Sequence, residues 1–329
     1  MTEAGMTESA ESLVRDGRGA MGWAERAPMS RHFDLANQKD YLAWRDEKLA
    51  RYPRSVDVLK VALGDIGCPS GEEKARITDL ARRANMAIYM TTADAASLAD
   101  ASPEALRPAM RAFGRAFELD IAEAHRSAEN EGIVAIEVAD TPAKRGFIPY
   151  TTKALSWHTD GYYNQPEEAI GGMLLHCVRP ASQGGVNALL DPEIAYIRLR
   201  DRSPALIAAL MHPEAMSIPE SVEDDGSVRP VSTGPVFIID AECKTLTMRY
   251  TARTRSVFWR DDDETRAAVA MLNELLSEQQ EPLILHYRLA AGEGLISNNV
   301  LHTRTAFEND GGIGRLLYRV RYTNRIAGT

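Results

Sequence analysis

The 329-residue sequence has few cysteines, no long hydrophobic run and no excess of basic residues. Its three cysteines are scattered and form no CxxC pair, which argues against a disulfide framework and against a thiolate metal site. We therefore expect reduced thiols and a cytoplasmic protein. No stretch approaches the roughly 18 apolar residues of a membrane-spanning helix, and the first 20 residues lack the apolar segment of a secretory signal.

Charge further limits the classes of partner. Acidic residues outnumber basic ones, and the formal net charge is −9. Nucleic-acid binding requires clustered lysine and arginine, so this balance disfavours a nucleic-acid partner. With 44% hydrophobic and 26% charged residues, the composition is that of an ordinary globular protein. A small-molecule substrate is the remaining expectation.

The chain divides by pattern into an arm, a helical portion and a β-rich portion. Residues 1–30 lack periodicity and predict a flexible arm. Helical patterns cover 41–52 and 71–86, and a third begins at Ser102-Pro103-Glu104 and extends with interruptions toward His125. Residues 31–130 are therefore predicted to be mainly helical.

Short β-rich runs separated by Gly, Pro, Asn and Asp clusters dominate the remainder. They lie at 133–138, 173–178, 236–240, 245–251, 283–289, 294–301 and 315–323, with helical patterns at 192–211 and 264–279. Many short strands with a few helices predict a mainly β fold, a barrel or double sandwich with flanking helices. We expect residues 31–329 to form a single catalytic domain.

The motif Trp157-His158-Thr159-Asp160-Gly161 carries the first chemical signal. On an extended segment, residues two apart project to the same side, so His158 and Asp160 can offer an imidazole and a carboxylate to one metal ion. This pair alone is weak evidence, because a surface turn produces the same spacing.

His302, in the run Asn298 to Arg304, can supply a third ligand. Two histidines and one carboxylate form a facial triad that leaves coordination positions open, an arrangement typical of non-haem Fe(II) oxygenases. The open positions allow a cosubstrate and O₂ to bind side by side.

The run 314–322 follows His302 closely and alternates with period two. Arg315, Leu317, Arg319 and Arg321 share one face. If this face is buried, its guanidinium groups need anions, and a dicarboxylate cosubstrate would satisfy them. An exposed strand edge is the alternative, but the nearby His302 favours the buried site.

These motifs, in this order, resemble the taurine dioxygenase / γ-butyrobetaine hydroxylase (TauD/TfdA) superfamily of Fe(II)- and 2-oxoglutarate-dependent oxygenases. The resemblance covers roughly residues 145–325. It rests on WHTDG, on LLHC followed by Gly184-Gly185, on NNVLHTRTAF and on RLLYR.

The resemblance implies a double-stranded β-helix (jelly-roll) core in residues 131–329, behind the helical N-terminal portion. It implies Fe(II) bound by His158, Asp160 and His302, with 2-oxoglutarate and O₂ as cosubstrates. Arg315 matches the arginine that binds the distal carboxylate of 2-oxoglutarate, and Arg319 matches a second family arginine. Homo-oligomers are common in the family.

The chain departs from the family pattern at Asn187, where members commonly carry a threonine that hydrogen-bonds 2-oxoglutarate. The Asn187 amide can still donate a hydrogen bond. The implied reaction is hydroxylation of an unactivated C–H bond in a small polar molecule, with succinate and CO₂ as products.

The substrate itself stays open. Tyr162 and Tyr163 can stack on a cation, whereas Arg249, with two further arginines at 253 and 255, can bind an anion; a zwitterion suits both. Ordinary loop packing and ion pairs with Asp261–Asp263 are the alternatives for these residues. A non-oxidative metal hydrolase and a catalytically inactive binding barrel are alternative functions, but a hydrolase does not need Arg315 and Arg319.

Overall fold

The computed structural model describes residues 31–91, 105–122, 132–139, 147–222, 226–240, 242, 244–255, 257–277, 281–311 and 314–329. The predicted arm, residues 1–30, lies outside the described residues. Within them no helix is long and apolar enough to cross a bilayer. Cys68 is exposed and Cys177 is buried, and both are free thiols.

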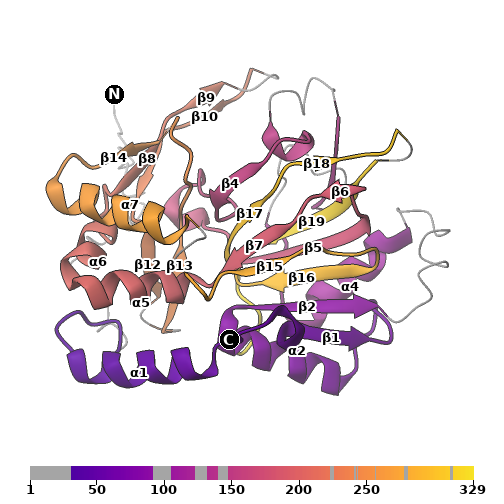
Figure 1. Ribbon diagram of the computed structural model, residues 1–329, viewed down its shortest axis with the longest axis horizontal. Coiled ribbons are helices and arrows are strands. Elements are labelled where there is room, and N and C mark those ends of the chain that lie inside the picture. The colour runs from indigo at the N-terminus through magenta and orange to yellow at the C-terminus, as the bar shows by residue number, and fades with distance from the viewer. Residues whose placement is uncertain are drawn as a thin grey trace, which may run out of the picture.

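Two mainly antiparallel sheets organise the fold (Figure 1). The larger sheet has the order β1 (Lys60–Leu63), β2 (Met86–Thr91), β16 (Glu293–Ser297), β5 (Gly172–Arg179), β19 (Leu316–Tyr322) and β3 (Ile133–Glu137), and only β1 and β2 pair in parallel. The smaller sheet has the order β15 (Leu285–Tyr287), β7 (Asn187–Leu190), β17 (Leu301–Arg304) and β4 (Leu155–His158). The chain crosses between them repeatedly, so residues far apart in sequence meet between the sheets.

Helices and small hairpins surround these sheets. The helices are α1 (Gln38–Arg51), α2 (Gly71–Ala84), α4 (Leu106–Ala116), α5 (Pro192–Arg202), α6 (Pro204–Leu210) and α7 (Asp263–Leu275). The small β elements are β6 (Gln183–Gly184) with β18 (Phe307–Glu308), β9 (Ser221–Val222) with β10 (Val228–Arg229), β12 (Phe237–Asp240) with β13 (Thr245–Met248), and β8 (Met216–Ile218) between β11 (Ser232–Gly234) and β14 (Phe258–Trp259). Three short 3₁₀ turns, η2 (Val56–Leu59), η5 (Ile148–Tyr150) and η6 (Pro166–Glu168), complete the described elements. In Figure 1, α5, α6 and α7 gather at one end of the molecule, beside the smaller sheet.

Local sequence explains where the helices begin. A capping box links Ser70 and Glu73 at the start of α2, and Asp262 accepts a hydrogen bond from the backbone of Thr265 at the start of α7. Asp191 caps α5 and is followed by proline at the first helical position. The predicted helices over 41–52 and 71–86 are confirmed as α1 and α2, and the mainly β fold with flanking helices is confirmed as well.

The prediction for the N-terminal third was incomplete. Its residues also form β1 and β2, and β2 pairs with β16, so this portion contributes strands to the larger sheet. The third helix ends at Ala116 rather than continuing toward His125, because Glu118 adopts a left-handed backbone and Ile121 pairs with Tyr322. The single run predicted over 294–301 is two strands, separated by a turn at Asn298–Val300.

A buried ion pair joins α1 to the start of α5. The Nζ of Lys48 lies 2.7 Å from Oδ2 of Asp191 and 2.5 Å from Oε2 of Glu193, and the side chains of Lys48 and Asp191 are 6% and 0% exposed. Asn85 donates to the other oxygen of Asp191 at 2.8 Å. One cation thus compensates two carboxylates that have little contact with water.

Replacing Lys48 by methionine is expected to lower the free energy of unfolding by about 3–5 kcal/mol, because two buried carboxylates lose their cation. Urea unfolding measures this difference. The control is Arg51→Ala, which removes the exposed pair with Glu47 and should cost no more than about 1 kcal/mol. Equal stability of the two variants would contradict the expectation.

Candidate active site

Three predicted ligands meet where β4 and β17 of the smaller sheet lie side by side. His158 ends β4 and pairs directly with His302 of β17, and their ring centroids are 4.2 Å apart. One ligand atom from each of His158, Asp160 and His302 lies within 4.8 Å of the others. All three residues are buried.

Asp160 reaches the histidines by a turn rather than along a strand. β4 ends at His158, and the chain turns through Asp160 and Gly161, whose φ is +67°. Strand periodicity predicted that His158 and Asp160 project to the same side of one extended segment, and this was wrong because Asp160 lies beyond the end of β4. The two side chains nevertheless lie close together. His158 Nε2 lies 3.9 Å from Asp160 Oδ1.

Backbone hydrogen bonds orient both imidazoles. Nδ1 of His158 donates to the carbonyl of Ser156, and Nδ1 of His302 donates to the carbonyl of Val300, each at 2.9 Å. Since a carbonyl only accepts, both Nε2 atoms are left with a free lone pair. Burial lowers the pKa of His158 to about 3 and also lowers the pKa of His302, so both rings are neutral at neutral pH.

Asp160 stays ionised although it is buried. Burial opposes its charge, but Arg319 and Arg321 outweigh this effect and hold the pKa of Asp160 well below its usual range. Both arginines contact Oδ1, from Nη1 of Arg319 at 3.4 Å and from Nη2 of Arg321 at 3.0 Å. The buried Oδ2 atom has no hydrogen-bond partner among the described residues. Two neutral imidazole nitrogens and one uncompensated carboxylate oxygen are a donor set that fits a divalent metal.

Asn299 fixes the backbone of this turn. Its Oδ1 accepts from the N–H of Asp160 at 2.8 Å, and its Nδ2 donates to the carbonyls of Asp160 and Ile170, each at 2.9 Å. Asn299 is 2% exposed and has a φ of +53°, which asparagine tolerates better than most residues. Sequence reasoning did not assign Asn299 this role.

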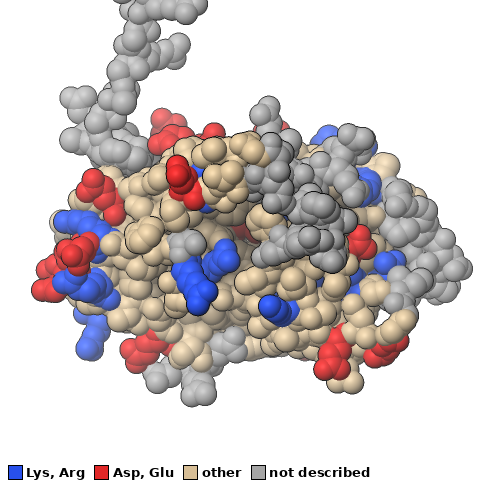
Figure 2. All heavy atoms as spheres, turned by 90° about the horizontal axis from the view of Figure 1, so that it is seen from above, with Lys and Arg blue, Asp and Glu red and all other residues tan. Residues whose placement is uncertain are grey.

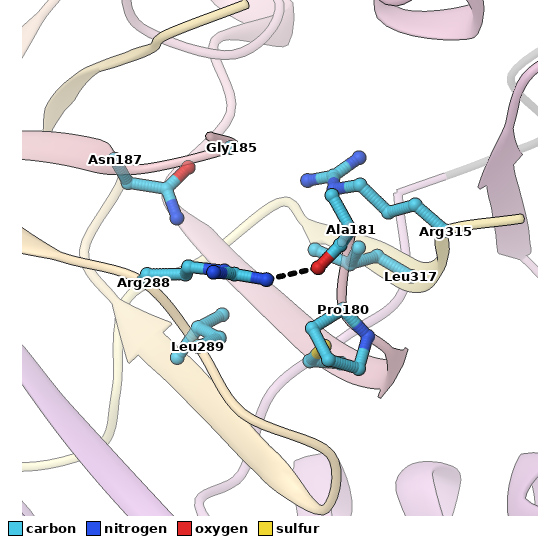
Figure 3. A pocket seen from close by; sticks show the side chains of 9 residues that line it. Pro180, Ala181, Gly185, Asn187, Arg288, Leu289, Arg315 and Leu317 are labelled. Carbon is cyan, nitrogen blue, oxygen red and sulfur yellow. Dashed lines mark hydrogen bonds between the residues drawn. The ribbon is translucent and has the colours of Figure 1, made fainter. Parts of the chain in front are cut away.

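A pocket lies beside β5, β7 and β19 (Figure 3). Its lining includes Arg315, Asn187 and Arg288. The Arg315 side chain is nearly buried, at 5% exposure, and makes no hydrogen bond or ion pair with the described residues. Its guanidinium carbon lies 5.0 Å from the centre of the Phe307 ring, and burial lowers the pKa of Arg315 to about 10. A buried guanidinium without an anion is a binding site for one.

Leu189 pairs with His302 in the smaller sheet, and Asn187 pairs with Arg304 two residues further along. Residues that pair across two strands project to the same face of the sheet. Asn187 therefore lies on the same face as His302, about 7 Å along the strand from the pair of Leu189 and His302. The structure therefore brings Asn187 and Arg315 together beside the triad. Nδ2 of Asn187 also donates to the carbonyl of Tyr287 at 3.4 Å.

The two tyrosines after the turn lie close to the triad. The Tyr162 ring centroid is 6.3 Å from that of His158, and the two tyrosine rings are 5.3 Å apart. The hydroxyl of Tyr163 accepts from Nη1 of Arg321 at 2.7 Å, and that of Tyr162 accepts from Nη1 of Arg253 at 3.2 Å. Arginines thus flank both predicted tyrosines.

Arg249 has a different position from the one predicted. It is 3% exposed, and it donates to the carbonyl of Met216 at 3.1 Å and to the carbonyl and hydroxyl of Ser232 at 2.9 and 2.8 Å. Its terminal nitrogens are occupied, so Arg249 joins β8 to β11.

The Asn299→Gly variant tests the turn that carries Asp160, because glycine keeps the left-handed backbone and removes only the side-chain hydrogen bonds. We expect affinity for Fe(II), titrated without oxygen, to fall about 10- to 100-fold. Lys244→Gly, at another left-handed position with a φ of +59°, is the matched control and should bind metal normally. Unchanged metal affinity in Asn299→Gly would contradict the assigned role.

Curated relatives include two proteins named uridine-5′-phosphate dioxygenase. The relative from Amycolatopsis sp. is 29% identical over 175 residues, which is 52% of this chain and 62% of the relative. The relative from Streptomyces sp. is 29% identical over 181 residues, which is 53% of this chain and 64% of the relative. The matched region thus spans less than two thirds of each relative.

Solved structures share the fold at low sequence identity. Asparagine oxygenase in complex with Fe(II), 2S,3S-3-hydroxyasparagine and succinate has a TM-score of 0.56 and 17% identity, with 89% of each chain covered. The PvcB protein from Pseudomonas aeruginosa has a TM-score of 0.52 and 19% identity, with 80% of this chain and 86% of that chain covered.

A family model covers most of the chain. The model of the taurine catabolism dioxygenase TauD, TfdA family matches residues 96–321, which include every predicted metal ligand and both arginines predicted to bind the cosubstrate. The predicted family and its dioxygenase enzyme class are confirmed by this match, and the Fe(II) and succinate of the asparagine oxygenase complex agree with the predicted cofactors. The chain belongs to the taurine catabolism dioxygenase TauD, TfdA family.

Proposed function

We propose that this chain is an Fe(II)- and 2-oxoglutarate-dependent dioxygenase that hydroxylates a C–H bond of a small phosphorylated molecule, within a double-stranded β-helix core. One observation supports this proposal above all others. The buried triad, with a free oxygen on Asp160, lies beside a pocket that holds the unpartnered guanidinium of Arg315. A metal hydrolase or an inactive barrel has no use for that second feature.

His158, Asp160 and His302 are the proposed iron ligands. When bound, Fe(II) with 2-oxoglutarate supplies the activation of O₂ that converts a substrate C–H into C–OH, leaving succinate and CO₂. The protein holds both imidazoles as neutral donors through the Ser156 and Val300 carbonyls. Arg319 and Arg321 keep Asp160 ionised, while burial keeps water away from the triad.

Arg315 is the proposed anchor for the distal carboxylate of 2-oxoglutarate. The guanidinium geometry matches a carboxylate in two-pronged contact, and burial strengthens such a pair. Asn187 lies about 7 Å along the strand from the position of His302, and a five-carbon diacid is long enough to span this distance. The opposite end of 2-oxoglutarate is thereby directed toward the triad.

The surroundings of the tyrosines favour an anionic substrate over a cationic one. Tyr162 and Tyr163 already accept hydrogen bonds from Arg253 and Arg321, so a quaternary ammonium group would meet two positive charges there. Arg253 is exposed, and its one hydrogen bond to Tyr162 leaves further N–H donors available. Figure 2 shows lysine and arginine side chains near the middle of one face, and basic and acidic side chains together along its rim.

The names of the curated relatives agree with this charge. A uridine 5′-phosphate carries a phosphate that suits guanidinium groups and a base that suits aromatic rings. We therefore propose a nucleoside monophosphate as the substrate class, with Arg253 as a phosphate ligand and with Tyr162 and Tyr163 beside the base or sugar.

Anaerobic absorbance titration tests the cosubstrate. Adding 2-oxoglutarate to the Fe(II)-loaded protein should produce a visible charge-transfer band, and Arg315→Ala should need about 10- to 100-fold more 2-oxoglutarate, because it loses a charge-assisted contact of roughly 1.5–3 kcal/mol. The control Arg266→Ala removes an exposed arginine on α7 and should titrate as wild type. No band in a protein with bound Fe(II) would favour the hydrolase or the inactive barrel.

Oxygen consumption with uridine and with uridine 5′-phosphate tests the substrate class. The phosphate should lower KM about 10- to 100-fold in the wild type, and Arg253→Ala should remove most of that difference while leaving 2-oxoglutarate binding unchanged. Arg260→Ala, which is also exposed, is the matched control. Equal KM values for the two compounds in the wild type would contradict a phosphate site.

A further inference from the structure

We infer that Arg288 is a second carboxylate-binding residue, which with Arg315 forms a two-arginine clamp selective for 2-oxo acids with a distal carboxylate. The inference rests on the proposed function and deepens it. Neither the motifs of the sequence nor the family resemblance assigned a role to Arg288.

Position is the first observation. Arg288 directly follows β15, and its side chain lines the same pocket as Arg315 (Figure 3). Its Nη2 donates across the pocket to the carbonyl of Ala181, and to that of Ser182 at 3.2 Å. These bonds leave Nε and Nη1 of Arg288 available to a ligand. The side chain thus spans the pocket from the end of β15 to the β5–β6 connection.

Charge is the second observation. Arg315 and Arg288 place two positive charges around one small pocket, and its other lining residues are Cys177, Pro180, Ala181, Gly185, Asn187, Leu289 and Leu317. None of these carries a carboxylate. Glu293, the nearby acid, is engaged with the hydroxyl of Tyr287 and the N–H of Ala290. Arg315 is buried and Arg288 is exposed, and no carboxylate of the pocket lining offsets their two charges, so an anion in this pocket would meet both guanidinium groups.

Asn187 connects the departure from the family pattern to Arg288. Its amide donates to the carbonyl of Tyr287, the residue immediately before Arg288, so Asn187 fixes the backbone from which Arg288 extends. With an Asn187 donor turned toward Tyr287, Nε and Nη1 of Arg288 offer further N–H donors in the same pocket. Arg288 therefore adds hydrogen-bond donors for the cosubstrate beside Arg315.

Binding measurements with two 2-oxo acids test the clamp. Fe(II)-loaded protein is titrated without oxygen with 2-oxoglutarate and with 2-oxobutanoate, which lacks the distal carboxylate. Arg288→Ala should weaken 2-oxoglutarate binding about 10- to 100-fold and leave 2-oxobutanoate binding within about twofold of wild type. Arg288→Lys keeps the charge without the two-pronged geometry and should fall between them. Arg266→Ala is the control, and urea unfolding checks that each variant is folded.

Each other outcome overturns the inference in a recognisable way. Wild-type 2-oxoglutarate affinity in Arg288→Ala, with weakened binding in Arg315→Ala, leaves the proposed function intact and removes Arg288 from the clamp. Equal weakening of both acids means that Arg288 only shapes the pocket, which also contradicts a carboxylate contact. Absence of a charge-transfer band in the wild type with bound Fe(II) contradicts the proposed function, and it therefore also contradicts the two-arginine clamp.

Discussion

The ionised carboxylate of Asp160, held inside the protein between Arg319 and Arg321, is the interaction on which the site depends. A buried carboxylate without a cation would take up a proton and lose its value as a ligand. Both arginines contact Oδ1, which also lies 3.9 Å from Nε2 of His158, and the buried Oδ2 has no hydrogen-bond partner among the described residues. Loss of one arginine would leave a partly compensated buried charge, at a cost of about 3–5 kcal/mol. The charge that would prepare the proposed metal site is thus also a constraint on the stability of the fold.

Both sheets contribute residues to the surroundings of Asp160. The smaller sheet provides His158 and His302 as a direct cross-strand pair, and β19 of the larger sheet provides the two arginines. Asn299, in the turn that leads from β16 to β17, closes the arrangement by holding both backbone groups of Asp160. A displacement of either sheet would therefore separate the carboxylate from its cations or from the histidines.

The sequence predicted the parts of the site that depend on local periodicity and failed where tertiary contacts decide. Period two in 315–322 predicted that Arg315, Arg319 and Arg321 share one face; Arg319 and Arg321 both contact Asp160, and Arg315 lines the pocket together with Leu317. β1 and β2 were missed because a short apolar run beside strong helical patterns has no periodicity that identifies a strand. Arg249 was predicted to bind substrate, because no feature of the neighbouring sequence distinguishes an arginine that binds a ligand from one that donates to backbone carbonyls. Asn299 and Arg288 were missed because their partners lie more than 100 residues away.

The cationic site contrasts with the acidic surface of the chain. The net charge of −9 repels anions at long range, but screening limits this repulsion to about 8 Å at physiological ionic strength. Within the site the balance reverses, because Arg253, Arg321, Arg315 and Arg288 outnumber the single carboxylate of Asp160. Arg315 is buried and gains most from an anion that replaces its lost water, whereas Arg253 and Arg288 are exposed and would act through their nearby charge. The two groups of arginines, at the pocket and at the tyrosines, are thus formed by different residues, so the proposed cosubstrate and the proposed substrate phosphate need not compete for one guanidinium group.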